Sequence, residues 1–268
     1  MALRGNASHP GARHAAREVL TAPGVTSDEF QALQDAHFAG ADAAHFQWTT
    51  MDAGFAPVED ALLLPRLAAL PFPCLEVGCG EGTNLTRLAH RGVPIGIDRY
   101  PGKVQFAARA VPGARVLAAD ALALPFRSGA FASVLVRDLL HHLETPRTAL
   151  AEVARVLRPG GTLLLLEPNG RNPIVALQAA LVPAERGIRR FTPAFVRGLF
   201  EGLPFASLQL ETTQAFPLRR LVLHYRFGVP SLGRTAGVAR LLDAAERFAE
   251  RLMPSTRRSY IGVTARRA

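Results

Sequence analysis

The sequence predicts an α/β protein built on a doubly wound, mainly parallel sheet. The middle of the chain alternates short apolar segments with helical ones, and the apolar segments are continuous, which is typical of strands buried on both faces. The first of them, residues 74–77, leads directly into a loop with three glycines in five residues. Alternation of strands and helices at this spacing predicts a parallel sheet with right-handed crossovers.

Seven segments are expected to form strands. They cover residues 74–77, 94–98, 114–119, 131–136, 162–167, 206–213 and 259–266. A helix after the first strand should end at Gly92, and one with apolar residues at helical spacing over 150–157 should end at Pro159. An apolar helical stripe over 238–252 separates the last two strands, which we expect to close the sheet edge as a hairpin.

The first 70 residues predict helices and no strand. Ser27 is placed to cap a helix over 28–38, and Pro57 is placed to begin another, which Pro65 should kink or end. Later in the chain, Thr192 is placed to cap a helix that begins at Pro193.

Charge and cysteine content exclude several classes of protein. The formal net charge is +9, yet residues 170–268 hold 16 arginines against 6 acidic residues, so the excess lies in the C-terminal part. Aromatic residues make up only 7% of the chain and do not interleave with basic stretches, so we expect no nucleic-acid partner. Two cysteines are too few for a disulfide framework, and no apolar run reaches the length of a membrane span or a signal core. A cytoplasmic protein is therefore expected.

The glycine-rich loop predicts a ligand-binding turn. Gly78, Gly80 and Gly82 permit positive φ and close approach of a ligand to a helix N-terminus. The dinucleotide fingerprint would need a third glycine at position 83, where the chain has Thr83. The carboxylate of Glu76 beside the loop would repel a pyrophosphate but suits a cation. S-adenosylmethionine (SAM), which carries a sulfonium and an ammonium, fits this pattern.

Residues 73–169 resemble the class I SAM-dependent methyltransferases, in the methyltransferase type 11, quinone-biosynthesis-like branch. The segment ExGxGxG at 76–82 is similar to motif I of that family, and GIDRY, AADALALPF, FASVLVRDLLHHL and EVARVLRPGGTLLLLEPN are similar to the motifs that follow. The resemblance implies a Rossmann-like sheet of seven strands, mainly parallel with an antiparallel C-terminal strand. It also implies SAM as cofactor and S-adenosylhomocysteine (SAH) as its product.

The resemblance further implies a set of cofactor-binding residues. In the family pattern, Asp98 would accept the ribose hydroxyls, Asp120 would accept from the adenine amine, and the Ala121 N–H would face the ring; capping of turns is the alternative for both aspartates. The expected cofactor-binding residues are Glu76, Gly78, Cys79, Gly80, Gly82, Asn84, Asp98, Arg99, Asp120, Ala121 and Arg137.

Three residues at the ends of strands are candidates for catalysis. His141 and His142 follow the fourth strand and Glu167 ends the fifth, at the sheet edge where open α/β folds bind ligands. Each is a candidate general base or substrate anchor; the alternative for the histidines is that they only hold the loop or touch the cofactor. A metal site made of Glu167 and a histidine has no supporting spacing, and we expect no metal.

The acceptor pocket is expected outside the recognisable motifs. We expect an N-terminal helical lid region over 1–70, and a methyltransferase domain over 71–268 with acceptor-side insertions near 170–190 and 217–256. Aromatic residues of the lid either cover the cofactor or pack in the core, and these are Phe46, Trp48 and Phe55. Residues 174–182 present an apolar face, and a cationic rim follows at Arg186, Arg189 and Arg190. Together they predict a bulky, hydrophobic acceptor with an acidic group; the alternative is helix packing with solvated arginines.

The expected function is methylation of a small hydrophobic or lipid-like molecule, at oxygen. Carbon or nitrogen acceptors are alternatives, as is a SAM-binding protein that does not methylate. A nucleic-acid methyltransferase is the reading that the basic C-terminal part suggests, but the fourth strand is followed by VRDLLHH and not by [DN]PP[YFW]. Peripheral membrane contact is compatible with a lipid acceptor, and the oligomeric state stays open.

Overall fold

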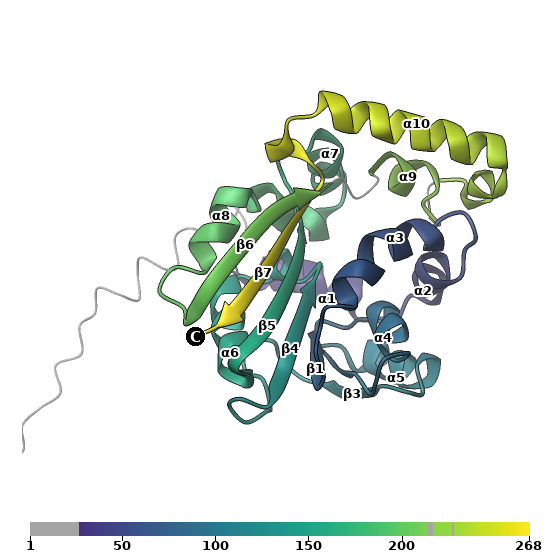
Figure 1. Ribbon diagram of the computed structural model, residues 1–268. Helices are drawn as coiled ribbons and strands as arrows, with labels where there is room; N and C mark the ends of the chain where they lie inside the picture. The colour runs from purple at the N-terminus through teal and green to yellow at the C-terminus, as the bar shows by residue number, and fades with distance from the viewer. Residues whose placement is uncertain (1–26, 214–216, 227) are drawn as a thin grey trace, which may run out of the picture.

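A computed structural model describes residues 27–213, 217–226 and 228–268 of the chain. Its centre is a seven-stranded sheet in the order β3-β2-β1-β4-β5-β7-β6 (Figure 1). The strands are β1 (Cys74–Val77), β2 (Ile95–Asp98), β3 (Arg115–Ala118), β4 (Phe131–Arg137), β5 (Leu157–Pro168), β6 (Phe205–Thr213) and β7 (Tyr260–Arg267). The first five are parallel to one another, and β7 runs antiparallel between β5 and β6. The doubly wound sheet and its antiparallel closure are therefore confirmed.

Helices cover both faces and the carboxyl edge of this sheet. They are α1 (Ser27–Phe38), α2 (Ala43–Thr50), α3 (Ala56–Leu67), α4 (Thr83–Leu88), α5 (Pro101–Ala110), α6 (Pro146–Val156), α7 (Pro173–Leu181), α8 (Pro193–Leu199), α9 (Pro217–Val222) and α10 (Ala236–Leu252). Short 3₁₀ helices connect them, namely η2 (Leu140–His142), η3 (Pro183–Arg190), η4 (Pro230–Arg234) and η5 (Ser255–Arg257). In Figure 1, α7, α9 and α10 lie beyond the carboxyl ends of β4 and β5. Among the described residues, no helix is long and apolar enough to cross a membrane.

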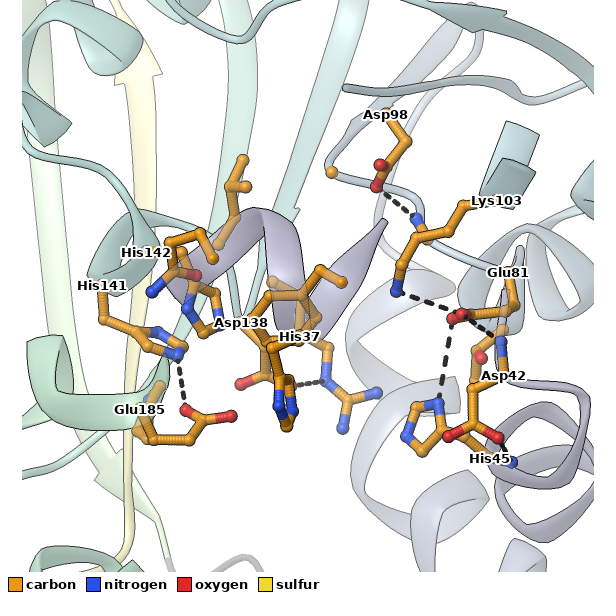
Figure 2. A pocket seen from close by; sticks show the side chains of 18 of the residues that line it. His37, Asp42, His45, Glu81, Asp98, Lys103, Asp138, His141, His142 and Glu185 are labelled. Atoms are coloured by element: carbon orange, nitrogen blue, oxygen red, sulfur yellow. Dashed lines mark hydrogen bonds and ion pairs between the residues drawn. The ribbon is translucent and has the colours of Figure 1, made fainter. Parts of the chain in front are cut away.

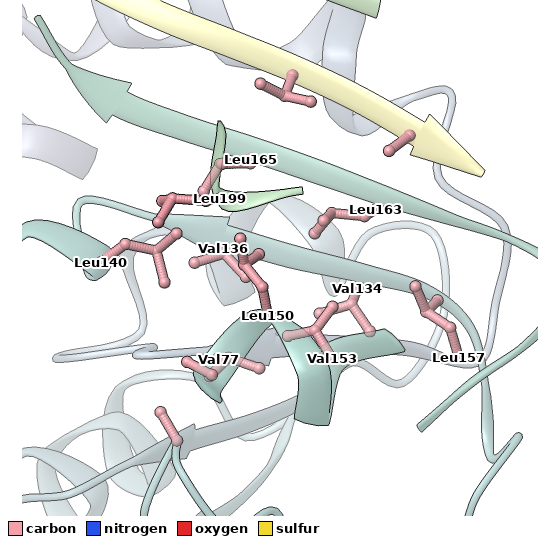
Figure 3. Packing of buried hydrophobic residues seen from close by; sticks show 14 of the residues in the cluster. Val77, Val134, Val136, Leu140, Leu150, Val153, Leu157, Leu163, Leu165 and Leu199 are labelled. Atoms are coloured by element: carbon pink, nitrogen blue, oxygen red, sulfur yellow. The ribbon is translucent and has the colours of Figure 1, made fainter. Parts of the chain in front are cut away.

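The core explains why the strand segments are continuously apolar. Val134 and Val136 of β4 belong to one buried cluster with Leu150 and Val153 of α6 (Figure 3). Leu135, whose side chain points to the opposite face, belongs to a second cluster that includes residues of α3 and α4. Both faces of β4 are buried, as expected for a parallel sheet between two helical layers.

The strand order places a ligand-binding crevice at the centre of the sheet. The chain runs outward from β1 through β2 to β3 and then returns to β4, which pairs with β1 on its other side. The connection after β1 therefore runs toward one edge of the sheet and the connection after β4 toward the other. Where two adjacent strands are left in opposite directions, a crevice opens at their carboxyl ends. The glycine loop after β1 and the histidine pair after β4 both lie at this point.

Two elements differ from the sequence expectation. The segment around Gly160 was expected to end a helix, but β5 already begins at Leu157 and contains it. Gly160 has a φ of +72°, and the pairing with β4 shifts register between Phe131 and Ser133, so the glycine lies in a strand irregularity. Pro65 lies inside α3, which continues to Leu67, so this proline does not end the helix.

The cap at the start of α8 is as expected and gives a stability prediction. The side chain of Thr192 accepts a hydrogen bond from the backbone N–H of Phe195. We expect Thr192→Ala to lower the free energy of unfolding by about 1 kcal/mol, because one partly buried N–H at the helix start loses its acceptor. Thr192→Ser, which keeps the hydroxyl, should stay close to the wild type. Urea unfolding of the two variants checks this, and equal losses would contradict the capping role.

Candidate active site

A cavity of about 1110 Å³ lies over the carboxyl ends of β1, β2 and β4. Its walls come from α1, α2, the glycine loop, η2, α7, η3 and α9. Figure 2 shows two polar groups in it, one around Asp98, Lys103 and Glu81 and another around His141, His142 and Glu185. Both groups line the same cavity. Segments before and after the sheet core therefore enclose a single site with two chemically distinct ends.

The glycine loop forms the floor of the first end. Gly78, Gly80 and Gly82 have φ values of +77°, +52° and +89°, which only glycine adopts readily. A Cβ on Gly78 would lie 2.9 Å from a methyl carbon of Leu139, so this glycine also permits close packing against the loop after β4. A Cβ on Gly80 would meet nothing within 4 Å, which leaves the backbone open toward a ligand. Gly82 does not line the cavity; it occupies the left-handed position that begins α4.

Asp98, at the end of β2, faces this loop. One carboxylate oxygen accepts from the Gly80 N–H at 2.9 Å and the other from the Tyr100 N–H at 3.0 Å. Burial raises the pKa of Asp98 above its ordinary value. Each oxygen keeps a free lone pair at the cavity wall, so the carboxylate can accept two further hydrogen bonds.

Glu76 is a buried carboxyl group with one unpartnered oxygen. Its side chain lines the cavity, Oε1 accepts from the Asn84 amide at 2.6 Å, and Oε2 has no partner. Burial raises the pKa of Glu76 to about 8, although the Asn84 hydrogen bond and the nearby Arg137 act in the opposite sense. An orphaned carboxylate oxygen at a cavity wall is a site for a cationic ligand group.

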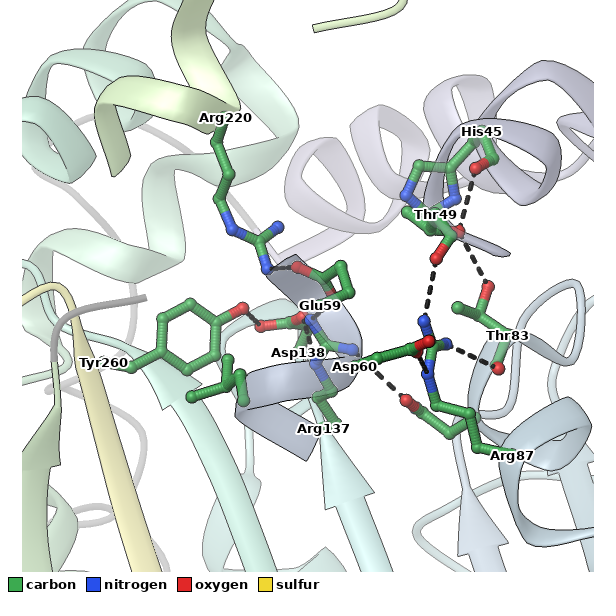
Figure 4. Close-up of polar contacts among 12 residues, drawn as sticks. His45, Thr49, Glu59, Asp60, Thr83, Arg87, Arg137, Asp138, Arg220 and Tyr260 are labelled. Atoms are coloured by element: carbon green, nitrogen blue, oxygen red, sulfur yellow. Dashed lines mark hydrogen bonds and ion pairs between the residues drawn. The ribbon is translucent and has the colours of Figure 1, made fainter. Parts of the chain in front are cut away.

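A buried ion network forms the wall beneath the loop (Figure 4). Arg137 donates to the Glu59 carboxylate at 2.7 Å and to the side-chain amide oxygen of Asn84 at 3.2 Å. Arg220 of α9 also pairs with Glu59. Burial alone would raise the pKa of Glu59, but the guanidinium charges of Arg137 and Arg220 lower it to about 2. The network joins α3, β4 and α9 at one cavity wall, so it fixes segments that are far apart in the sequence.

Glu81 ties α2 and α5 to the glycine loop. The Lys103 ammonium lies 3.0 Å from its carboxylate, the Asp42 N–H donates to it at 2.9 Å, and the His45 ring lies 3.9 Å away. Burial would raise the pKa of Glu81, but these neighbours, His45 and Lys103 above all, lower it to about 2. No sequence pattern indicates this contact, because Asp42, His45 and Lys103 belong to no motif.

The histidine pair lies at the other end of the cavity. His141 Nδ1 is 2.6 Å from Glu167 Oε2, and His141 Nε2 is 3.2 Å from Glu185 Oε2. Burial would lower the pKa of His141, but the neighbouring Glu167 carboxylate raises this pKa to about 10. Burial and the positive charge of His141 lower the pKa of His142 to about 3. The hydrogen bond from His141 lowers the pKa of Glu185 to about 2 against the effect of burial.

Glu167 itself lies outside the cavity. It is fully buried, and its Oε1 accepts the N–H groups of Leu139 and Leu140 at 3.1 and 2.7 Å. Both of its oxygens are engaged, so it holds η2 and orients His141. Among the sequence-derived candidates it is therefore a positioning residue.

The remaining candidates divide between the cavity and its surroundings. Ten of the eleven expected cofactor residues line it, namely Glu76, Gly78, Cys79, Gly80, Asn84, Asp98, Arg99, Asp120, Ala121 and Arg137. Asp120 also accepts a hydrogen bond from the Leu122 N–H at 2.8 Å, so it caps a turn as well.

Of the three aromatic residues expected in the lid, Trp48 lines the cavity, whereas Phe46 and Phe55 are buried and do not. None of the three arginines expected as a cationic rim lines it, namely Arg186, Arg189 and Arg190.

Comparison with known proteins shows which proteins the chain is similar to. Residues 75–165 match the methyltransferase domain family. The phthiotriol/phenolphthiotriol dimycocerosates methyltransferase 1 of Mycobacterium ulcerans is 31% identical over 180 residues, covering 64% of this chain and 63% of that protein. The demethylmenaquinone methyltransferase of Renibacterium salmoninarum is 35% identical over 108 residues, covering 40% and 46%. Each match spans less than two thirds of the relative's own length.

The fold is shared with solved structures of low sequence identity. Phosphoethanolamine N-methyltransferase 2 of Haemonchus contortus, solved in complex with S-adenosyl-L-methionine, superposes with a TM-score of 0.64 at 15% identity. The superposition covers 91% of this chain and 60% of that one. The shared fold thus extends beyond residues 75–165.

Proposed function

Since this chain carries a methyltransferase domain of the class I, SAM-dependent type, we propose that it transfers a methyl group from SAM to a small, bulky, hydrophobic acceptor, at an oxygen atom. The observation that carries this proposal is the single cavity that joins the glycine-loop end to the histidine end. Methyl transfer needs the cofactor and the acceptor in line within one water-poor space.

The residues at the glycine-loop end fit the cofactor. The unpartnered oxygen of Glu76 matches the ammonium of the methionine part, and the free lone pairs of Asp98 match the ribose hydroxyls. Asp120 and the Ala121 N–H are the proposed contacts of the adenine. When bound, SAM supplies a methyl group already activated by its sulfonium. The protein then has to position both reactants and exclude water.

The lining of the other end supports a bulky, apolar acceptor. Apolar residues of α7 and η3 line this wall, and they are Ile174, Val175, Leu177, Leu181, Val182 and Ile188. Leu177 and Leu181 are 54% and 72% exposed, so the apolar surface continues to the mouth of the cavity. Because the expected cationic rim does not line the cavity, the proposal includes no acidic group on the acceptor.

His141 and His142 are the polar groups that meet the acceptor. Both line the cavity, and Nδ1 of His142 is buried without a hydrogen-bond partner. We place the acceptor hydroxyl against this pair, in line with the methyl group of the cofactor, so that one imidazole takes the hydroxyl proton as the methyl group passes to oxygen and SAH is left. Glu167 acts through His141 by fixing the orientation of its ring.

The proposal is tested by following the methyl group. Purified protein is incubated with methyl-labelled SAM and a cell extract that is then separated into lipid, small-molecule, RNA and protein pools, with heat-inactivated protein as control. We expect enzyme-dependent label in the lipid or small-molecule pool, and ¹³C NMR of the product should show an O-methyl group. Label in RNA or protein would overturn the acceptor class, and an N- or C-methyl signal would overturn the oxygen assignment. SAM binding without any label would favour a protein that does not methylate.

A further inference from the structure

Three potential ligand groups meet at the histidine end of the cavity. His141, His142 and Glu185 each offer an atom, and these atoms lie within 4.8 Å of one another. Two of them come from η2 and the third from η3, which packs against η2. Gly187 permits this packing, since a Cβ there would lie 1.8 Å from the carbonyl oxygen of His141. The backbone is therefore shaped to bring Glu185 against the histidines.

His141 is oriented as metal-binding histidines are. Its Nδ1 is 2.6 Å from a buried carboxylate oxygen of Glu167, and that carboxylate is itself fixed by two backbone N–H groups. A carboxylate on one ring nitrogen holds a proton there, and the other nitrogen becomes the ligand once a metal displaces its own proton, an arrangement found around zinc sites. The other nitrogen, Nε2, faces Glu185.

One pair of these atoms has the spacing of two ligands of a small divalent cation. With bonds of about 2.0–2.1 Å to nitrogen and oxygen, two ligands of a tetrahedral site lie about 3.3 Å apart. His141 Nε2 and Glu185 Oε2 lie 3.2 Å apart. His142 adds a ring that lies with its centre 3.8 Å from that of His141, and its Nδ1 is buried with no partner. An unpartnered imidazole nitrogen beside a carboxylate offers two ligand atoms that suit a metal cation.

We propose that His141, His142 and Glu185 bind a divalent transition metal ion whose remaining coordination positions face the acceptor. Two histidines and one carboxylate suit zinc, iron or manganese and leave positions open for an oxygen ligand. The inference rests on the proposed function in one respect: it narrows the acceptor to molecules whose reacting group is a hydroxyl or enol oxygen able to coordinate the metal. From the sequence we expect no metal, because no spacing supports a site made of Glu167 and a histidine; Glu185 lies 44 residues from His141 and belongs to no motif.

The test is direct titration of metal in the absence of SAM and acceptor. Chelator-treated protein is titrated with Co²⁺, followed by its visible absorption, and then with Zn²⁺ as competitor. We expect one Co²⁺ per chain with a spectrum of nitrogen and oxygen ligands, displaced by one Zn²⁺. His142→Ala and Glu185→Gln should each weaken binding by at least about 100-fold. Glu167→Gln should weaken it by about 10- to 100-fold, since it removes the group that orients a ligand.

A matched control is His45→Ala, which removes a histidine from the same cavity at its other end. Its metal affinity should equal that of the wild type. Absence of stoichiometric Co²⁺ binding would overturn the proposal, as would binding that survives His142→Ala and Glu185→Gln. The circular dichroism spectrum of every variant reports whether it is folded. Because the metal titration uses neither reactant, its failure leaves the proposed methyl transfer untouched, and failure of SAM binding leaves the metal site untouched.

Discussion

Replacing Asp98 with alanine is expected to weaken SAM binding by about 100-fold or more. We propose that the carboxylate accepts two hydrogen bonds from the ribose hydroxyls, and each bond to a charged group contributes about 1.5–3 kcal/mol. Since about 1.4 kcal/mol corresponds to a tenfold change in affinity, two lost bonds account for the expected loss. Isothermal titration calorimetry of the wild type and the variant with SAM measures it.

The control for this prediction separates recognition from folding. Asp28→Ala removes an exposed carboxylate from α1 and should leave the affinity for SAM unchanged. Asp98→Asn keeps an oxygen that can accept from the Gly80 N–H, so it should retain the native circular dichroism spectrum while binding SAM more weakly than the wild type. An affinity for SAM that is unchanged in Asp98→Ala would show that the ribose lies elsewhere.

The second large effect is on stability. Glu59→Gln is expected to lower the free energy of unfolding by about 3 kcal/mol, because it removes the buried carboxylate that pairs with the buried guanidinium of Arg137 and leaves it only the more exposed Asp138. Glu211→Gln is the matched control: it breaks an exposed ion pair with Arg66 and should cost less than about 1 kcal/mol. Urea unfolding at neutral pH measures both. Equal losses in the two variants would contradict a stabilising role of the buried network.

The same network predicts how stability depends on pH. The pKa of Glu59 falls from its ordinary value of 4.5 to about 2 on folding, so its ionised form stabilises the folded state. That contribution is fully present above about pH 4.5 and is lost as the pH falls toward 2. The wild type should therefore lose stability over this range, and Glu59→Gln should lose less. Parallel pH profiles of the free energy of unfolding would contradict the assignment.

The cofactor end of the site was largely predictable, because its signals are local. A glycine loop between a buried strand and a helix, followed by an aspartate at the next strand end, places Gly80 and Asp98 together once the sheet is parallel. The structure joins the two by a hydrogen bond of 2.9 Å. Strand positions were also predictable, because burial on both faces leaves continuous apolar segments.

The acceptor end was not predictable, because its contacts join segments far apart in the chain. Glu185 and the α1 residue His37 both line the cavity, yet neither lies in a motif or at a recognisable distance from the histidine pair. Hydrophobic periodicity also does not predict whether an apolar helical stripe is covered. In α10, Leu241, Phe248 and Leu252 belong to such a stripe and are 69%, 64% and 69% exposed.

The central claim, that the glycine-loop end of the cavity binds SAM, is tested most directly by calorimetric titration of the purified protein with SAM, SAH and NAD. Glu76 and Asp98 fit a cofactor with an ammonium and a ribose, and the buried carboxyl group disfavours a pyrophosphate. We expect SAM and SAH to bind at one molecule per chain and NAD to give no heat of binding. Binding of NAD without binding of SAM or SAH would contradict the account.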